Sequence, residues 1–307
     1  MRRLAVLMGV CALGVFIGSR TGWGLRVVTT TTDLAALTRA VGGEHVDVHA
    51  IAKGVQDPHY VDAKPSFIRK VNRADLLIFN GLELEVAWLP LLIEGARNRA
   101  LTPGSAGLLD ASAAVNRLEV PLGEVDRSQG DIHPQGNPHY LLDPRNGVLV
   151  AQLIGDRLRQ LDPAHADNYA AAQVQFAAEM GSRIEHWEHR LRAMGSISLV
   201  AFHRTWTYLG SWANLRIANY IEEKPGIPAG PRHLAALVDQ VTAENIGVIA
   251  LAHYNPTRSA ESLAERSGAR VVVLPAAVLA FDDVATYPDV FERIVSVFEG
   301  WEVAGSD

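Results

Sequence analysis

The chain has 307 residues, of which 48% are hydrophobic and 20% are charged, with a formal net charge of −6. This composition is typical of a globular protein rather than a disordered one, and the length is sufficient for two α/β lobes that each bury a core. The negative charge and the lack of a basic run beyond the first residues argue against a nucleic-acid partner.

The first 24 residues have the pattern of a secretory signal peptide. Arg2 and Arg3 precede an apolar stretch over residues 4–17, and small residues follow it. The stretch is shorter than a membrane-spanning helix requires, which favours cleavage near Gly24 over an uncleaved anchor. The sequence before Cys11 is not a lipobox, so lipid attachment is not expected. We therefore expect a periplasmic protein whose mature chain has no thiol, so any metal ligands would be nitrogen or oxygen atoms.

Short apolar strands alternate with helices in the first part of the mature chain. Strands are predicted over residues 25–30, 45–51 and 75–80, and helices over 32–40, 65–71 and 84–97. Thr32 and Asp33 are candidate N-caps of the first helix, and Gly42-Gly43 ends it. This βαβα order predicts a mainly parallel sheet with right-handed crossovers.

Residues 119–136 break this alternation, because Gly, Pro and acidic residues predict a surface loop there. The chain is then helical from Arg145, and a long helix is predicted from Ala164 to Ala193. Further strands are predicted over 197–202, 215–221, 247–252 and 270–274, and helices over 204–213, 230–243, 256–267 and 286–299.

The predicted fold is α/β, with two mainly parallel-sheet lobes bridged by one long helix. The predicted segments are a signal peptide (1–24), an N-terminal lobe (25–145), a helical segment that includes the linker helix (146–194) and a C-terminal lobe (195–307).

Three histidines occur in related surroundings and give the strongest functional signal. His59 lies in Asp-Pro-His-Tyr, His139 in Asn-Pro-His-Tyr, and His203 follows the apolar run over 197–202. Groups just beyond the carboxyl end of a strand often bind ligands in α/β proteins, and clefts between lobes are common ligand sites. Neutral imidazoles are good zinc ligands. The three histidines therefore predict a metal site in the cleft between the lobes.

Several short motifs together resemble the metal-binding solute-binding proteins of ABC importers, specifically the zinc-uptake branch. They cover nearly all of the mature chain and comprise Thr29-Thr30-Thr31-Thr32-Asp33, Gln56-Asp57-Pro58-His59, Ala63-Lys64-Pro65-Ser66, Asn80-Gly81-Leu82-Glu83, Gly136-Asn137-Pro138-His139-Tyr140, Leu142-Asp143-Pro144, Phe202-His203 and Glu223-Lys224-Pro225-Gly226-Ile227. The resemblance implies two lobes bridged by a long helix, with the metal held between them by His59, His139 and His203. Manganese-binding relatives have a carboxylate where this chain has His203, and imidazole suits zinc better.

The fourth ligand is where the chain departs from the family pattern. Many relatives have an aspartate soon after the last strand, but residues 273–278 contain no acid. We take Asp283 as the fourth ligand, with Asp282 or a water molecule as alternatives and helix capping as the other role for these acids. Three acids are candidates to accept the second ring N–H of a ligand histidine, although helix capping is the more ordinary role for the first and the last of them. They are Asp33, Glu85 and Asp143.

Two other histidine groups are weaker candidates. His186 and His189 lie one turn apart on the long helix and could chelate a metal, but a solvated helix face is the better interpretation. His133 lies in the predicted loop over 119–136, where it is either a transient capture group for zinc or part of an inert linker.

We predict a periplasmic high-affinity receptor that binds Zn²⁺ as its transported ligand and delivers it to a membrane ABC permease. We expect a monomer without enzymatic activity, and a periplasmic zinc metallochaperone is a candidate second partner. The alternatives are a manganese or iron solute-binding protein of the same family, a His₃-zinc hydrolase and a surface adhesin. The chain has no His-Glu-x-x-His motif and no evident general base beside the histidines, which argues against the hydrolase.

Overall fold

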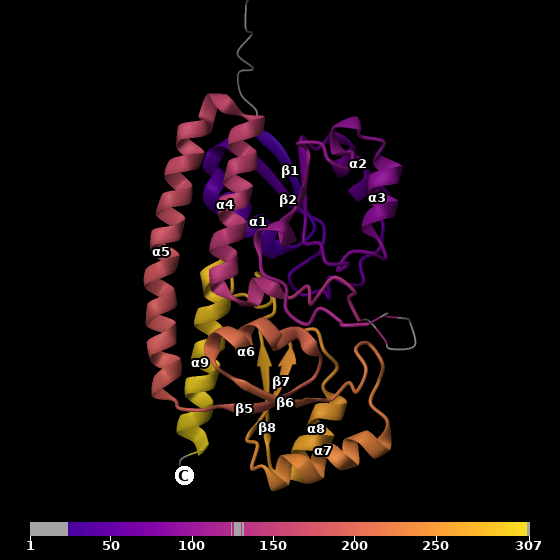
Figure 1. Cartoon of the computed structure of the whole chain (residues 1–307), viewed down its shortest axis with the longest axis vertical. Helices are drawn as coiled ribbons and strands as arrows, with labels where there is room; N and C mark the ends of the chain where they lie inside the picture. The colour runs from indigo at the N-terminus through magenta and orange to yellow at the C-terminus, as the bar shows by residue number, and fades with distance from the viewer. Residues whose placement is uncertain (1–23, 124, 126–129, 131, 306–307) are drawn as a thin grey trace, which may run out of the picture.

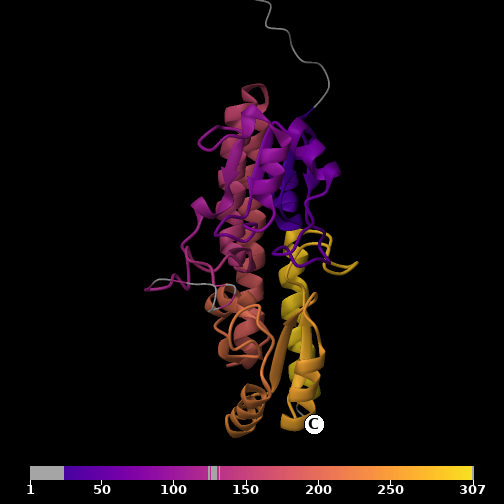
Figure 2. The ribbon, with the colours of Figure 1, turned by 90° about the vertical axis from the view of Figure 1, so that its right-hand side faces the viewer.

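The computed structural model describes residues 24–123, 125, 130 and 132–305. The predicted signal peptide, apart from Gly24, and Cys11 lie outside these residues. Among the helices of the described part of the chain, none is long and apolar enough to cross a membrane. The molecule is elongated, with two lobes placed one above the other along its long axis (Figure 1 and Figure 2).

Each lobe is built on a four-stranded sheet in which every neighbouring pair is parallel. The first sheet has the order β2-β1-β3-β4, with β1 at Leu25–Thr29, β2 at Val46–Ala50, β3 at Leu76–Phe79 and β4 at Leu108–Asp110. The second has the order β6-β5-β7-β8, with β5 at Ser198–Ala201, β6 at Arg216–Tyr220, β7 at Val248–Ala252 and β8 at Arg270–Leu274. The predicted fold of two mainly parallel α/β lobes is confirmed.

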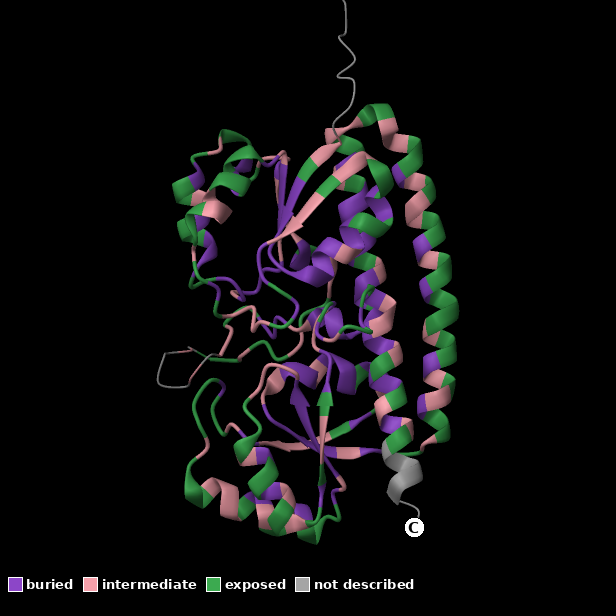
Figure 3. Ribbon diagram, turned by 180° about the vertical axis from the view of Figure 1, so that it is seen from behind, coloured by how far each residue is buried: buried purple, intermediate pink, exposed green. Residues whose placement is uncertain are grey.

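Helices cover both faces of each sheet. They are α1 (Thr32–Gly42), α2 (Pro65–Arg73), α3 (Leu89–Ala96), α4 (Pro144–Leu161), α5 (Ala166–Ala193), α6 (Thr207–Ala213), α7 (Pro231–Ala243), α8 (Arg258–Ser267) and α9 (Tyr287–Gly305). Val27 packs in the core with α1, α4 and α5, whereas its neighbour Val28 packs on the other face with α2 and α3. In the second lobe α7 and α8 cover one face, and α6 and α9 the other. Strands buried on both faces explain the continuous apolar runs in the sequence (Figure 3).

The ends of the helices follow local side-chain chemistry. The Thr31 side chain caps α1 by accepting from the Leu34 N–H, one residue before the predicted caps. Gly43 ends the same helix at a φ of 54°, in the region that favours glycine. The predicted long helix is present as the 28-residue α5, which begins at Ala166 because Pro163–His165 forms a short 3₁₀ turn before it.

Two features of the first lobe differ from the prediction. The helix expected over 84–97 begins only at Leu89, because Leu82 and Glu83 have positive φ angles and residues 82–88 form turns. The Glu85 carboxylate accepts from the backbone N–H groups of Asn80 and Gly81, which stabilises these turns instead of a helix. Strand β4 was not predicted, because its three residues are too few to give a periodic signal.

Helices α5 and α9 lie side by side along the molecule. The Arg190 guanidinium on α5 forms ion pairs with Glu292 and Glu299 on α9, each at 2.6 Å. The Trp187 indole N–H also donates to Glu292 at 2.8 Å. One continuous apolar core extends past these helices from the first lobe into the second. The proposed lobe boundaries near residues 145 and 194 stay a prediction.

Candidate metal centre

The carboxyl ends of both sheets face the junction of the two lobes. The Thr32 hydroxyl, just after β1, donates to the Val278 carbonyl at 2.7 Å, and the Val278 N–H donates to Asp33 at 3.0 Å. Val278 follows β8, so these bonds join the two lobes at their strand ends. A third bond links the His253 ring to the Gly54 carbonyl at 2.6 Å. These contacts fix the relative position of the segments that carry the three histidines.

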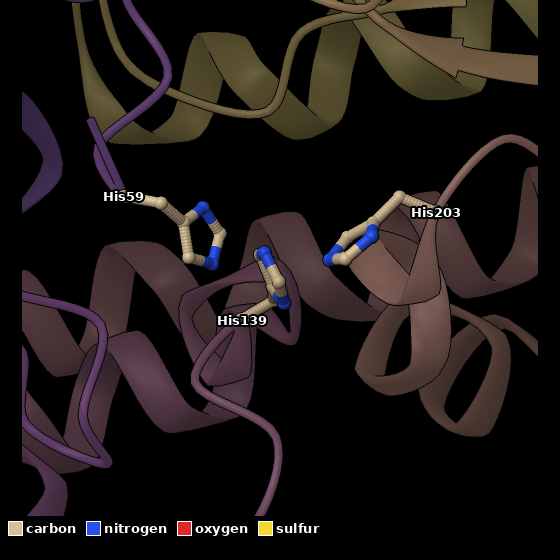
Figure 4. Close-up of side chains that lie close together, drawn as sticks. All are labelled: His59, His139 and His203. Carbon is tan, nitrogen blue, oxygen red and sulfur yellow. The ribbon is translucent and has the colours of Figure 1, made fainter. Parts of the chain in front are cut away.

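The structure brings His59, His139 and His203 together at this junction. One nitrogen from each ring belongs to a group whose members all lie within 4.8 Å of one another. The ring centroids are 5.4 Å apart for His59 and His139, 5.5 Å for His139 and His203, and 5.9 Å for His59 and His203. Figure 4 shows the three rings converging from three different segments of the chain. Nitrogens bound to a single zinc ion are each about 2.0–2.1 Å from it and so must lie within a few ångströms of one another.

Hydrogen bonds to the Nδ1 atoms orient the two histidines that follow a proline. The Asp57 carboxylate accepts from both the backbone N–H and the Nδ1 of His59, at 3.0 and 2.7 Å. The Asn137 side-chain oxygen accepts from the same two groups of His139, each at 2.9 Å. Since a carboxylate or amide oxygen can only accept, each Nδ1 carries the proton and each Nε2 keeps its lone pair. The two Asx-Pro-His sequences therefore orient their histidines through the same local hydrogen-bond pattern.

Glu222 has the same role for His203. Its carboxylate accepts from Nδ1 at 2.8 Å, and both side chains are only 13% exposed. The Gly226 N–H donates to the same carboxylate oxygen at 2.8 Å and so holds it in place. Glu222 lies just after β6, next to β5 in the sheet, and His203 lies just after β5. This adjacency of two strand ends is the signal that could have revealed the pair.

The three candidate acceptors from the sequence each have another partner, and Asp143 has the capping role that was the expected alternative. Asp33 accepts from the Val278 N–H, and Glu85 accepts from the Asn80 N–H. Asp143 caps α4 and forms an ion pair with Arg145. The acceptors are Asp57, Asn137 and Glu222.

The Nε2 atoms of His59 and His139 are buried and have no hydrogen-bond partner. Such atoms are rare in folded proteins and call for an explanation, such as an ion. Burial lowers the pKa of His139 well below its ordinary value, and the charges of His59 and His203 lower it further. Burial alone would raise the pKa of Asp57, but the hydrogen bonds and charge of His59 bring it below its ordinary value. His139 thus presents a neutral nitrogen donor, and His59 is backed by an ionised carboxylate, an arrangement that suits a divalent cation.

The structure does not bring Asp283 to this cluster. The Asp283 side chain is 59% exposed and lies 3.5 Å from the Arg293 guanidinium. Its alternative, Asp282, is exposed as well. Over the described ranges, no carboxylate joins the three histidines in a group with metal-ligand spacing. The residues after β8 instead contact Thr32 and Asp33 through Val278.

The other candidates from the sequence have structural roles or are exposed. His186 and His189 are both exposed on α5 and belong to no metal-type group among the residues described, as expected for a solvated face. Arg204, next to His203, forms an ion pair with Glu119 at 3.0 Å and lies over the Tyr220 ring.

The family of zinc-uptake complex component A, a periplasmic protein (ZnuA), has a sequence profile that matches residues 27–300. The chain belongs to this family. Curated proteins similar to this chain are named as substrate-binding lipoproteins of metal ABC transporters. The resemblance inferred from the short motifs is therefore confirmed.

Curated relatives and a solved structure agree with this membership. The metal ABC transporter substrate-binding lipoprotein ScbA of Streptococcus cristatus is 31% identical over 148 residues, which are 47% of this chain and 44% of the relative. The manganese ABC transporter substrate-binding lipoprotein PsaA of Streptococcus pneumoniae is 31% identical over 170 residues, 54% of this chain and 51% of the relative. The chain thus spans about half the length of the curated relatives it matches. A crystal structure of ZnuA superposes with a TM-score of 0.76 and 23% identity, covering 92% of this chain and all of that one.

Proposed function

We propose that this protein is a periplasmic receptor that binds Zn²⁺ between its lobes and delivers it to a membrane ABC permease. In this proposal His59, His139 and His203 bind the ion through their Nε2 atoms. The observation that carries it is the convergence of three imidazoles, each with its Nδ1 proton held by an oxygen acceptor. This arrangement leaves three lone pairs directed at one position, as metal-ligating histidines require.

The chemistry of the donors favours zinc over manganese. Three imidazole nitrogens and no carboxylate form the described group, and nitrogen ligands suit zinc whereas oxygen ligands suit manganese. The relatives give a second candidate, because one of the proteins similar to this chain is named a manganese-binding lipoprotein. Manganese is therefore the competing ion in the test.

The test is metal content and competition binding on purified protein, with His203→Ala beside the wild type. The expected result is one zinc ion per chain that excess manganese does not displace and that the variant loses. His189→Ala is the matched control, since it removes an exposed imidazole from α5 and should leave zinc binding unchanged. Displacement by manganese would make the protein a manganese receptor. Full zinc affinity in the His203→Ala variant would remove that residue from the site.

The remaining expectations are part of the same proposal. We propose that the protein acts as a monomer in the periplasm and receives zinc either directly or from a metallochaperone. When the full chain is expressed, it should be recovered from the periplasm with residues 1–24 removed. Light scattering on this material then gives its oligomeric state.

A further inference from the structure

Three histidine ligands leave one position of a tetrahedral zinc ion open. Asp283, which was predicted to fill it, forms an ion pair elsewhere. A water molecule is one solution, but a receptor that must hold its ion tightly gains from a fourth protein ligand. The segment between β4 and α4 provides a candidate.

The imidazole of His133 lies beside the three histidines. Its ring centroid is 5.5 Å from that of His59, which is within the range of distances among the three proposed ligands. The Nε2 atom of His133 is buried, although the residue as a whole is half-buried. His133 also lines a cavity of about 200 Å³ together with His139 and His203. The cavity therefore provides space for an ion and for small shifts of these rings.

Contacts with the second lobe hold both ends of the segment that carries His133. The Leu118 N–H donates to the Tyr208 hydroxyl at 2.9 Å, and the Leu118 carbonyl accepts from the Asn137 N–H at 2.9 Å. The Asn137 amide nitrogen donates to Glu119 and to the Arg204 carbonyl, at 2.9 and 2.8 Å. Asn137 thus orients His139 and also ties this segment to the residue that follows His203.

The backbone around His133 is also restricted. Gly130 has a φ of 85°, and a Cβ atom there would lie 2.2 Å from the Pro225 carbonyl oxygen, so only glycine allows this approach to the second lobe. Pro134 limits His133 to extended conformations, and the Gly136 N–H closes a turn on the His133 carbonyl at 3.1 Å. These restraints act on the backbone of a residue whose side chain lines the cavity.

We infer that His133 is the fourth ligand of the proposed metal site, so that four imidazoles hold the ion. This inference rests on the proposed function. The His133 nitrogens lie outside the group of atoms within 4.8 Å of one another, so its side chain turns toward the ion when the ion binds. A site of four nitrogens would disfavour manganese more strongly than a site of three nitrogens and a carboxylate.

The test compares His133→Ala with the wild type, using Zn²⁺ competition binding and the visible absorption of Co²⁺ bound in place of zinc. The variant should bind zinc at least about 10- to 100-fold more weakly, the usual cost of losing an outer partner of a metal ligand. Its cobalt spectrum should also shift, because an oxygen replaces a nitrogen. Gln135→Ala is the matched control, since Gln135 is an exposed residue two positions away in the same turn. That variant should match the wild type in both measurements.

The outcomes separate this inference from the proposed function. If His203→Ala abolishes zinc binding while His133→Ala keeps wild-type affinity and an unchanged cobalt spectrum, His133 is not a ligand and the three-histidine site stands. If wild-type protein binds no zinc, both proposals fail. Thermal unfolding of the metal-free variants should match that of the wild type, which separates loss of a ligand from loss of the fold.

Discussion

Replacing Glu222 with alanine would free the His203 imidazole from the carboxylate that orients it. The hydrogen bond is 2.8 Å long and both side chains are 13% exposed, so water screens it only partly. A hydrogen bond to a charged group contributes about 1.5–3 kcal/mol, which corresponds to about a 10- to 100-fold loss of zinc affinity. The Glu222→Gln variant should lose less zinc affinity, because its amide oxygen still accepts from Nδ1 although the charge is removed.

The assay is competition against a chromogenic zinc chelator at neutral pH. Glu223→Ala is the matched control, because Glu223 is an exposed neighbour with the same charge. If Glu222→Ala binds zinc as tightly as the wild type, the carboxylate does not orient the ligand and our account of the site is refuted. Equal losses in both variants would mean that net charge, rather than the contact with His203, sets the affinity.

Two further predictions concern stability. Burial raises the pKa of Asp33 from 3.8 to about 7, so the folded protein binds a proton that the unfolded chain releases, and stability falls as pH rises from about 4 to 7. Asp33→Asn should remove this fall in the free energy of unfolding, which is on the order of 4 kcal/mol at most. Parallel pH curves for urea unfolding of the variant and the wild type would contradict this prediction. Gly147→Ala would place a Cβ 2.2 Å from the buried Tyr287 ring and should cost about 1–3 kcal/mol. In the exposed control Gly181→Ala the Cβ would meet nothing within 4 Å, so equal midpoints for these two variants would overturn the steric argument.

The central strands β1, β3, β5 and β7 could be predicted from the sequence because they are largely buried on both faces. Runs such as Leu199 to Phe202 are apolar without alternation and are followed by polar or glycine-rich breaks. The Asx-Pro-His repeats also identified two of the converging histidines, since the residue two positions earlier is the acceptor for each ring. These are local relations, which a sequence displays directly.

Relations between distant segments could not be predicted in the same way. Glu222 and His203 are 19 residues apart and meet only because β5 and β6 are adjacent. Asp283 is close to the expected position in sequence, but the segment after β8 turns to Thr32 and directs this acid to Arg293. The Glu85 region has a helical composition, yet residues 82–88 form turns in which the Glu85 carboxylate accepts from the backbone N–H groups of Asn80 and Gly81. In each case tertiary contacts override the local preference.

The continuous α5 helix limits how the molecule can deform. With 28 residues it is about 42 Å long. The ion pairs of Arg190 attach the carboxyl-terminal part of α5 to α9. These two helices form a rigid connection along the length of the molecule. A large rotation of one lobe relative to the other would have to bend these helices or break the ion pairs of Arg190. A small displacement of the loops at the cleft would leave both intact. Release of a metal ion bound as proposed should therefore depend on local movement of the loops at the cleft rather than on a wide separation of the lobes.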